Sequence, residues 1–365
     1  MSLVAALLAV NACASVYRPG PSYQERRWTA YLGSSQRASA AADTLAADPE
    51  PVWRTDVGRG VVGAAALTED LVVLAQVDRQ LTVLNRGTGA IVWRRRFGEN
   101  LGSGPLVDFD HVFFATQTDQ GQVIALALST GKKLWSARLG DIVAPLAIHD
   151  AQVYAGTVGG LFAALTAAGW ARVWRTQLNG AVRAAPVVVA GGVIAATGAD
   201  SLYLLDRASG AVRARRGTNG TVLAAPALAD SLLLFGTTGG NLVACDTATL
   251  ATRWSLDVGS EVIGAVAVQR DTAYVLTHDG DVWWVPLAAP AHAFKVALGI
   301  VARGGPTPVA GGVLVAAVGG QLALVDASGA RLWTAQVKPP VVQPVLVDGR
   351  FLVAVSERGE VVAFR

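Results

Sequence analysis

Short apolar runs separated by clusters of glycine, aspartate, serine and threonine recur along most of the chain. In one stretch four such runs follow one another, at 103–109, 111–117, 122–128 and 132–140. The gaps between them have the length and composition of turns that join neighbouring antiparallel strands. The pattern predicts a four-stranded antiparallel sheet built from about 40 residues.

The same plan returns eight times. One slot in the fourth strand of each unit recurs at steps of 40, 42, 39, 40, 40, 40 and 39 residues. Its occupants are Trp53, Trp93, Trp135, Trp174, Ala214, Trp254, Phe294 and Trp333. A turn followed by a third strand, as in "GGLFAAL" (159–165), also occurs eight times. Two signals with one count and one period predict an all-β, eight-bladed β-propeller, with the large rings filling the space between adjacent blades.

The order of strands predicts how the ring closes. The segment "PVWRTDV" (51–57) is a fourth strand that precedes any first, second or third strand. The last unit, 341–365, contains three strands and no fourth. We therefore expect the N-terminal strand to complete the last blade, which removes two sheet edges that would otherwise be open to aggregation.

The amino terminus has the pattern of a leader. Residues 3–10 are uninterruptedly apolar, and Asn11, Ala12 and Cys13 follow. The run is too short to span a bilayer but has the length of a secretory signal core. A small residue directly before a cysteine resembles a bacterial lipoprotein signal. We expect a signal segment at 1–12, a flexible tether at 13–50 with the lipid on Cys13, and the propeller at 51–365; the alternative is an uncleaved or secreted leader without lipid.

Composition supports a β-rich body. The 365 residues are 52% hydrophobic and 16% charged, with 40 glycines and a net charge of +3. A small charge of mixed sign excludes a broad footprint for nucleic acid. The densest basic run, Arg94, Arg95 and Arg96, flanks a repeat tryptophan and is interpreted as a solvated strand face.

Candidate chemistry is sparse. Cys245 is the only cysteine besides Cys13, so it is interpreted as a small apolar core residue. The string Asp279, Gly280 and Asp281 is too short for a calcium loop and indicates a hairpin turn. The four histidines are scattered without metal-ligand spacing. We expect no catalytic residue, no cofactor and no metal.

The strings "NRGTGAIVW" (85–93), "LSTGKKLW" (128–135) and "DASGARLW" (326–333) resemble the tryptophan-docking repeat of the quinoprotein superfamily, also called the PQQ repeat, with glycine four residues before tryptophan. The resemblance covers roughly residues 51–365. Two branches share the repeat. The quinone-dependent dehydrogenases carry adjacent cysteines, which this chain lacks, and a calcium ion. The BamB family of outer-membrane barrel-assembly lipoproteins is similar in length, blade number and leader.

Resemblance to the BamB family implies a non-enzymatic scaffold, lipid-anchored at the periplasmic face of the bacterial outer membrane. Its implied partners are the periplasmic repeats of the barrel-inserting protein and unfolded β-barrel chains; a monomeric propeller is expected.

In the BamB family the contact surface lies on loops at one end of the ring. The corresponding loops here are 178–186, 218–226 and 257–265, and the nearest analogues of the family's binding residues are Val182, Arg183 and Glu261. Three alternatives stay open. The exposed outer strands could accept an extended client by strand addition. The central funnel could hold a quinone or another small ligand. The ring could serve a different partner in the cell envelope.

Overall fold

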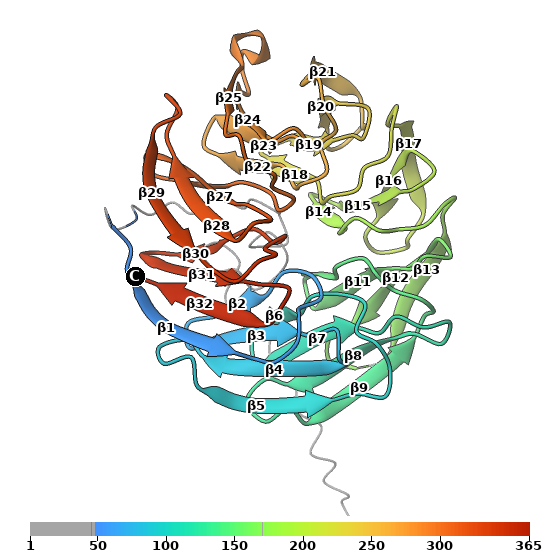
Figure 1. Cartoon of the computed structure of the whole chain (residues 1–365). Helices are drawn as coiled ribbons and strands as arrows, with labels where there is room; N and C mark the ends of the chain where they lie inside the picture. Colours follow the sequence, from blue (N-terminus) through green and yellow to red (C-terminus); the bar gives the residue numbers. More distant parts are fainter. Residues whose placement is uncertain (1–44, 46–47, 170) are drawn as a thin grey trace, which may run out of the picture.

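The computed structural model describes residue 45, residues 48–169 and residues 171–365. In this part of the chain, 32 strands form eight four-stranded antiparallel sheets arranged around a central axis (Figure 1). The predicted eight-bladed propeller is confirmed. Cys13 and the leader lie outside the described residues. Within the residues described, no helix is long and apolar enough to cross a membrane.

The blades are numbered in chain order, and the strands of each are given from the axis outward. The first four blades consist of β2 (Ala66–Leu67), β3 (Leu71–Ala75), β4 (Gln80–Asn85) and β5 (Ile91–Arg96); β6 (Leu106–Asp108), β7 (His111–Ala115), β8 (Gln122–Ala127) and β9 (Lys133–Arg138); β10 (Ala147–His149), β11 (Gln152–Gly156), β12 (Leu161–Thr166) and β13 (Arg172–Gln177); and β14 (Val187–Val189), β15 (Gly192–Thr197), β16 (Ser201–Asp206) and β17 (Val212–Gly217).

The other four blades follow the same order. They consist of β18 (Ala227–Ala229), β19 (Leu232–Gly236), β20 (Asn241–Asp246) and β21 (Thr252–Asp257); β22 (Ala267–Gln269), β23 (Thr272–Leu276), β24 (Asp281–Pro286) and β25 (Phe294–Ala297), with the short 3-10 helix η2 (Pro290–His292) before β25; β26 (Thr307–Val309), β27 (Gly312–Ala316), β28 (Gln321–Val325) and β29 (Arg331–Gln336); and β30 (Leu346–Asp348), β31 (Phe351–Val355), β32 (Glu360–Phe364) and β1 (Pro51–Asp56).

Burial explains why the inner strands are continuous apolar runs. The middle strands of each blade are covered on both faces by the neighbouring blades, so β7 is buried at all five positions. The outermost strands have only their inner edge paired, and most of their residues are exposed, as in β5. The core therefore consists of apolar layers between adjacent blades.

The ring closes as predicted. Strand β1 pairs antiparallel with β32, with Trp53 opposite Ala363. The chain ends form a pair of their own, because the N–H groups of Glu50 and Arg365 donate to each other's carbonyl oxygens at 3.1 and 2.9 Å. Leu45, which falls in the segment expected to be a tether, is 7% exposed and belongs to the core of the last two blades. The ring thus includes residues before 51.

The repeat tryptophans link neighbouring blades. The indole N–H donates to a backbone carbonyl in the next blade from Trp53 to Arg86 (2.7 Å), from Trp93 to Leu128 (2.7 Å), from Trp135 to Ala167 (2.9 Å), from Trp174 to Arg207 (2.8 Å) and from Trp333 to Pro49 (3.1 Å). Each acceptor lies in the connection between the third and fourth strands of the receiving blade, and Pro49 lies where the chain ends replace that connection. The repeat signal in the sequence is thus a contact between blades.

The glycine of the repeat motif is required because the docked indole lies against it. Gly89 and Gly210 have φ of 70° and 72°, and a Cβ on either would lie 2.5 Å from the ring of the docked tryptophan, Trp53 or Trp174. A side chain at these positions would strain the backbone and displace the indole.

The two slots without tryptophan are accommodated differently. Opposite Ala214 the receiving glycine is replaced by Leu250, which is 1% exposed and fills the space that an indole would take. Phe294 stacks on Trp284 of its own blade, with ring centroids 5.6 Å apart. One docking is incomplete: β21, which carries Trp254, meets η2 in place of a glycine turn, and the Trp254 indole N–H lacks an acceptor within the described residues.

Candidate partner-binding face

One face of the ring carries the loops that join the outermost strand of a blade to the innermost strand of the next. These loops approach one another so closely that small residues are required. A Cβ on Gly304 would lie 2.6 Å from the backbone of Gln343. Ala185, Ala225 and Ala265 of three successive loops pack together in one buried cluster. Glycine, alanine and proline near the ends of these loops therefore reflect convergence of the chain toward the axis.

Each of the loops is fixed by a buried aliphatic residue. The backbone N–H of Val182 donates to Thr157 of the preceding blade at 3.0 Å, and that of Val262 donates to Thr237 at 3.1 Å. Both valine side chains are buried in the core. The chain is extended here, so the next residue faces away from the core.

The residue presented in this way lies four positions before each innermost strand. We call the eight equivalents the inner-loop residues: Val62, Gly102, Val143, Arg183, Leu223, Ile263, Arg303 and Val342. The two arginines and Leu223 are exposed, and the remaining aliphatic residues are half-buried. Partly exposed aliphatic side chains beside arginines are typical of protein-binding surfaces.

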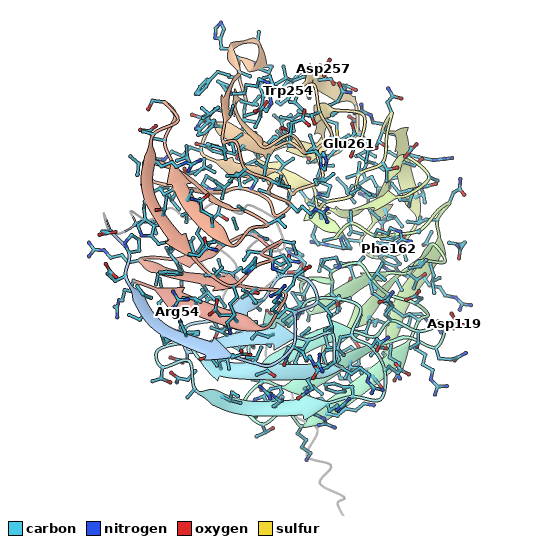
Figure 2. All side chains as sticks on the ribbon, viewed as in Figure 1. Arg54, Asp119, Phe162, Trp254, Asp257 and Glu261 are labelled. Atoms are coloured by element: carbon cyan, nitrogen blue, oxygen red, sulfur yellow. The ribbon has the colours of Figure 1, made fainter. Side chains whose placement is uncertain are left out.

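The structure separates the predicted contact residues. Arg183 and Glu261 are exposed on the loop face, and Figure 2 shows Glu261 closer to the axis than Asp257 of the same loop. Val182 is 0% exposed, so its side chain supports the loop and is not available to a partner. We correct its expected role accordingly. Leu223 and Arg303 were missed, although their fixed spacing from the inner strands would have identified them.

Hydrogen bonds between blades and within the loops hold the exposed loops. In the loop that carries Leu223, the Thr221 hydroxyl donates to Asp200 at 2.7 Å, and the Thr221 N–H donates to the Thr238 hydroxyl at 3.1 Å. In the loop between the last and first blades, the Gly58 N–H donates to Asp56 at 2.8 Å. This bond and the nearby Lys338 ammonium lower the pKa of Asp56. The face is thus preorganised, which reduces the entropy cost of binding.

The other residues considered for chemistry have structural roles. Burial raises the pKa of the Cys245 thiol to about 11, which keeps it protonated. Asp281 pairs with Lys295 at 2.6 Å, and Gly280 turns the chain with φ of 86°. Within the described ranges, no three His, Cys, Asp or Glu side chains are grouped so as to hold a metal ion.

The fold and the docking of indoles on the next blade define the chain as a β-propeller of PQQ-like repeats. The sequence profile of the family described as outer membrane protein assembly factor BamB matches residues 36–143, 120–213, 200–288 and 281–365. The chain belongs to this family.

Solved structures of several functions share the fold. BamB from Moraxella catarrhalis superposes with a TM-score of 0.74 and 19% identity, over 87% of this chain and 99% of that chain. Quinohemoprotein alcohol dehydrogenase from Comamonas testosteroni superposes with a TM-score of 0.79 and 13% identity, over 94% and 81%. The computationally designed Ika8 protein gives 0.72 and 15%, over 88% and 99%. At these identities the likeness shows the fold alone. Among curated proteins, no significant match was found.

Proposed function

We propose that this protein is a non-enzymatic scaffold of the outer-membrane barrel-assembly machinery. The observation that carries the proposal is the match of the BamB family profile across all eight blades. In this proposal the chain is anchored through a lipid on Cys13 at the periplasmic face of the outer membrane. Its partners are the periplasmic repeats of the barrel inserter and unfolded barrel chains.

The loop face supports this function physically. Arg183 and Arg303 stand on loops three blades apart and have no acidic partner within the described chain, and the exposed Leu223 lies between them in chain order. Arginine and aliphatic anchors within a rigid face supply most of the free energy in many protein interfaces. Glu261 stays a proposed contact on the same face.

The alternative of a quinoprotein dehydrogenase finds no support in the residues near the axis. Those enzymes have a fold similar to that of this chain. A function like theirs would require residues that hold a calcium ion beside a quinone. The inner ends of the loops contribute alanine and glycine, such as Ala225, Ala265 and Gly304. These residues offer no carboxylate cluster, so the donor set does not fit the group.

A charge-reversal experiment tests the function. The double variant Arg183→Glu/Arg303→Glu should reduce co-purification with the barrel inserter by at least tenfold, since interface arginines of this kind contribute about 2 kcal/mol or more. The matched control is Arg270→Glu/Arg350→Glu, an equal change of charge at two exposed positions of the opposite face. Unchanged co-purification in the first variant, or equal losses in both, would contradict the proposal.

A further inference from the structure

Basic side chains are concentrated on one half of the outer rim. The outermost strands of the first four blades, β5, β9, β13 and β17, contain three, two, two and three Arg or Lys residues and no Asp or Glu. The outermost strands of the other four blades contain four basic and two acidic residues. The first four lie consecutively along the outside of the ring (Figure 1). We call this ten-charge half rim the basic arc; the net charge of the whole chain is only +3.

Ion pairing also differs between the two halves. On the opposite half Arg54, Arg253 and Lys295 each lie 2.6–3.5 Å from a carboxylate oxygen. On the basic arc, considering the described residues, only Arg213 has an acidic partner. Five side chains of the arc make no hydrogen bond or ion pair within the described chain: Arg96, Lys133, Arg138, Arg172 and Arg175. These cations are available to an anionic ligand.

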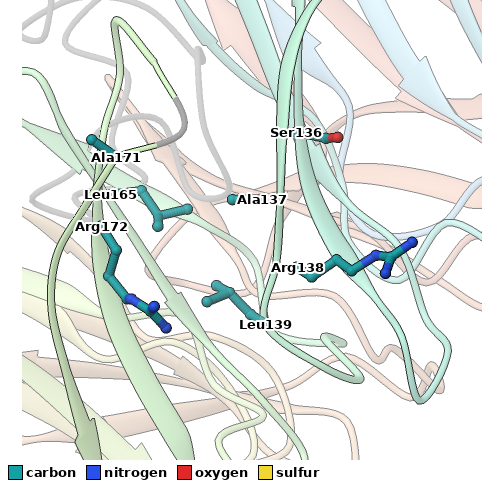
Figure 3. A pocket seen from close by; sticks show the side chains of 7 residues that line it. All are labelled: Ser136, Ala137, Arg138, Leu139, Leu165, Ala171 and Arg172. Carbon is teal, nitrogen blue, oxygen red and sulfur yellow. The ribbon is translucent and has the colours of Figure 1, made fainter.

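An open groove of about 480 Å³ lies at the middle of the arc, between the second and third blades. The Arg172 side chain extends toward Leu139, whereas the Arg138 side chain leaves the other side of β9 and points away from both (Figure 3). Leu165 and the methyl groups of two alanines complete an apolar lining. The groove thus combines apolar surface with the cation of Arg172, and Arg138 adds a second cation on the rim beside it, which suits a ligand that has an anionic head and an apolar portion.

The rest of the arc has the same mixed character. Ile91, Val92, Val173 and Val212 are 40–49% exposed and lie on the same strands as the basic residues. These strands expose no aromatic ring, because their tryptophans dock against the next blade, so the base-stacking platform typical of single-stranded nucleic acid binding is missing. Exposed aliphatic and cationic side chains together are typical of surfaces that bind anionic membranes.

We propose that the basic arc binds the surface of an anionic phospholipid membrane, with the disc standing on its edge. A flat surface meets a convex rim over about two neighbouring blades, which places β9 and β13 in contact. Strands β5 and β17 then act at longer range, within a Debye length of about 8 Å at physiological salt or somewhat beyond it. The inference rests on the proposed function, since the lipid anchor is what holds the ring near a membrane.

Vesicle co-sedimentation tests the inference. The full chain carrying Cys13→Ser is mixed with phosphatidylcholine vesicles, with or without phosphatidylglycerol. We expect binding only to the anionic vesicles, and binding should weaken as NaCl rises from about 0.05 to about 0.5 M. The variant Arg138→Glu/Arg172→Glu should bind at least tenfold more weakly. Arg138→Lys/Arg172→Lys keeps the charge and should bind within about twofold of the parent chain.

The control Arg270→Glu/Arg350→Glu makes the same change of charge on the sixth and eighth blades, away from the arc. An equal loss in this control, or equal binding to neutral vesicles, would overturn the inference. Binding of an acidic oligopeptide without preference for anionic vesicles would overturn it as well, and would assign the arc to a protein partner. The arc variant should still co-purify with the barrel inserter, so failure of the membrane inference is distinguishable from failure of the proposed function.

Discussion

The docking of Trp53 on Gly89 holds the closing strand of the ring, and substitution of the glycine should show how strongly. In Gly89→Ala the new Cβ would lie 2.5 Å from the indole ring, at a backbone φ of 70°. The backbone strain costs about 1 kcal/mol. Displacing the indole loses its hydrogen bond to Arg86, about 1 kcal/mol, and about 2 kcal/mol of aromatic burial. We expect the free energy of unfolding to fall by about 3–5 kcal/mol.

Two glycine controls separate the causes. Gly311 has φ of 91° and open space around its Cα, so Gly311→Ala should show the backbone strain alone, about 1 kcal/mol. Gly98 also has open space but no positive φ, so Gly98→Ala should change stability by less than about 0.5 kcal/mol. Urea denaturation measures all three. In a Trp53→Ala background, Gly89→Ala should again cost only about 1 kcal/mol. Equal effects of Gly89→Ala and Gly311→Ala would refute the docking argument.

Three further outcomes follow from the described contacts. Ala214→Trp should destabilise the ring because buried Leu250 occupies the docking space, and adding Leu250→Gly should recover most of the loss in urea denaturation. The side-chain hydrogen bond from Arg253 is the main interaction that lowers the pKa of Asp246, from 3.8 to about 2. The stability it contributes is complete above about pH 4 and is lost as pH falls toward 2, so Asp246→Asn should flatten the pH dependence of the unfolding midpoint in that range. Cys245 should resist alkylation until the ring unfolds in denaturant, as measured by mass spectrometry.

The blade count and the closing strand were predictable because each depends on a repeated local signal. The tryptophan slot and the turn before the third strand can both be recognised from residues that are close together in the sequence, even though the indole docks on another blade. The contribution of residues before 51 to the ring was not predictable. Leu45 and Pro49 belong to the ring through contacts with the seventh and eighth blades, and their own segment has no strand pattern in the sequence. The repeat therefore predicted the number and order of the blades, but not the residue at which the ring begins.

The loop face shows a second limit of the sequence prediction. Val182 and Arg183 are adjacent, and which of the two side chains is exposed depends on a hydrogen bond to Thr157 in another blade. Arg94, Arg95 and Arg96 were interpreted as a solvated strand face. Arg94 and Arg96 are indeed exposed, whereas the Arg95 guanidinium donates to the Gly131 carbonyl at 2.6 Å. A basic arc becomes visible only when the four outermost strands are placed side by side.

The inferred surfaces lie at right angles, and this has a consequence for assembly. The inner-loop residues occupy a face of the disc, whereas the basic arc occupies its rim. A ring that rests on its rim has its axis parallel to the membrane, so Arg183 and Leu223 point sideways along the bilayer surface. Reversing charge at Arg138 and Arg172 would remove the orientation but leave the face intact, so the partner should then bind with unchanged contacts and a less favourable entropy.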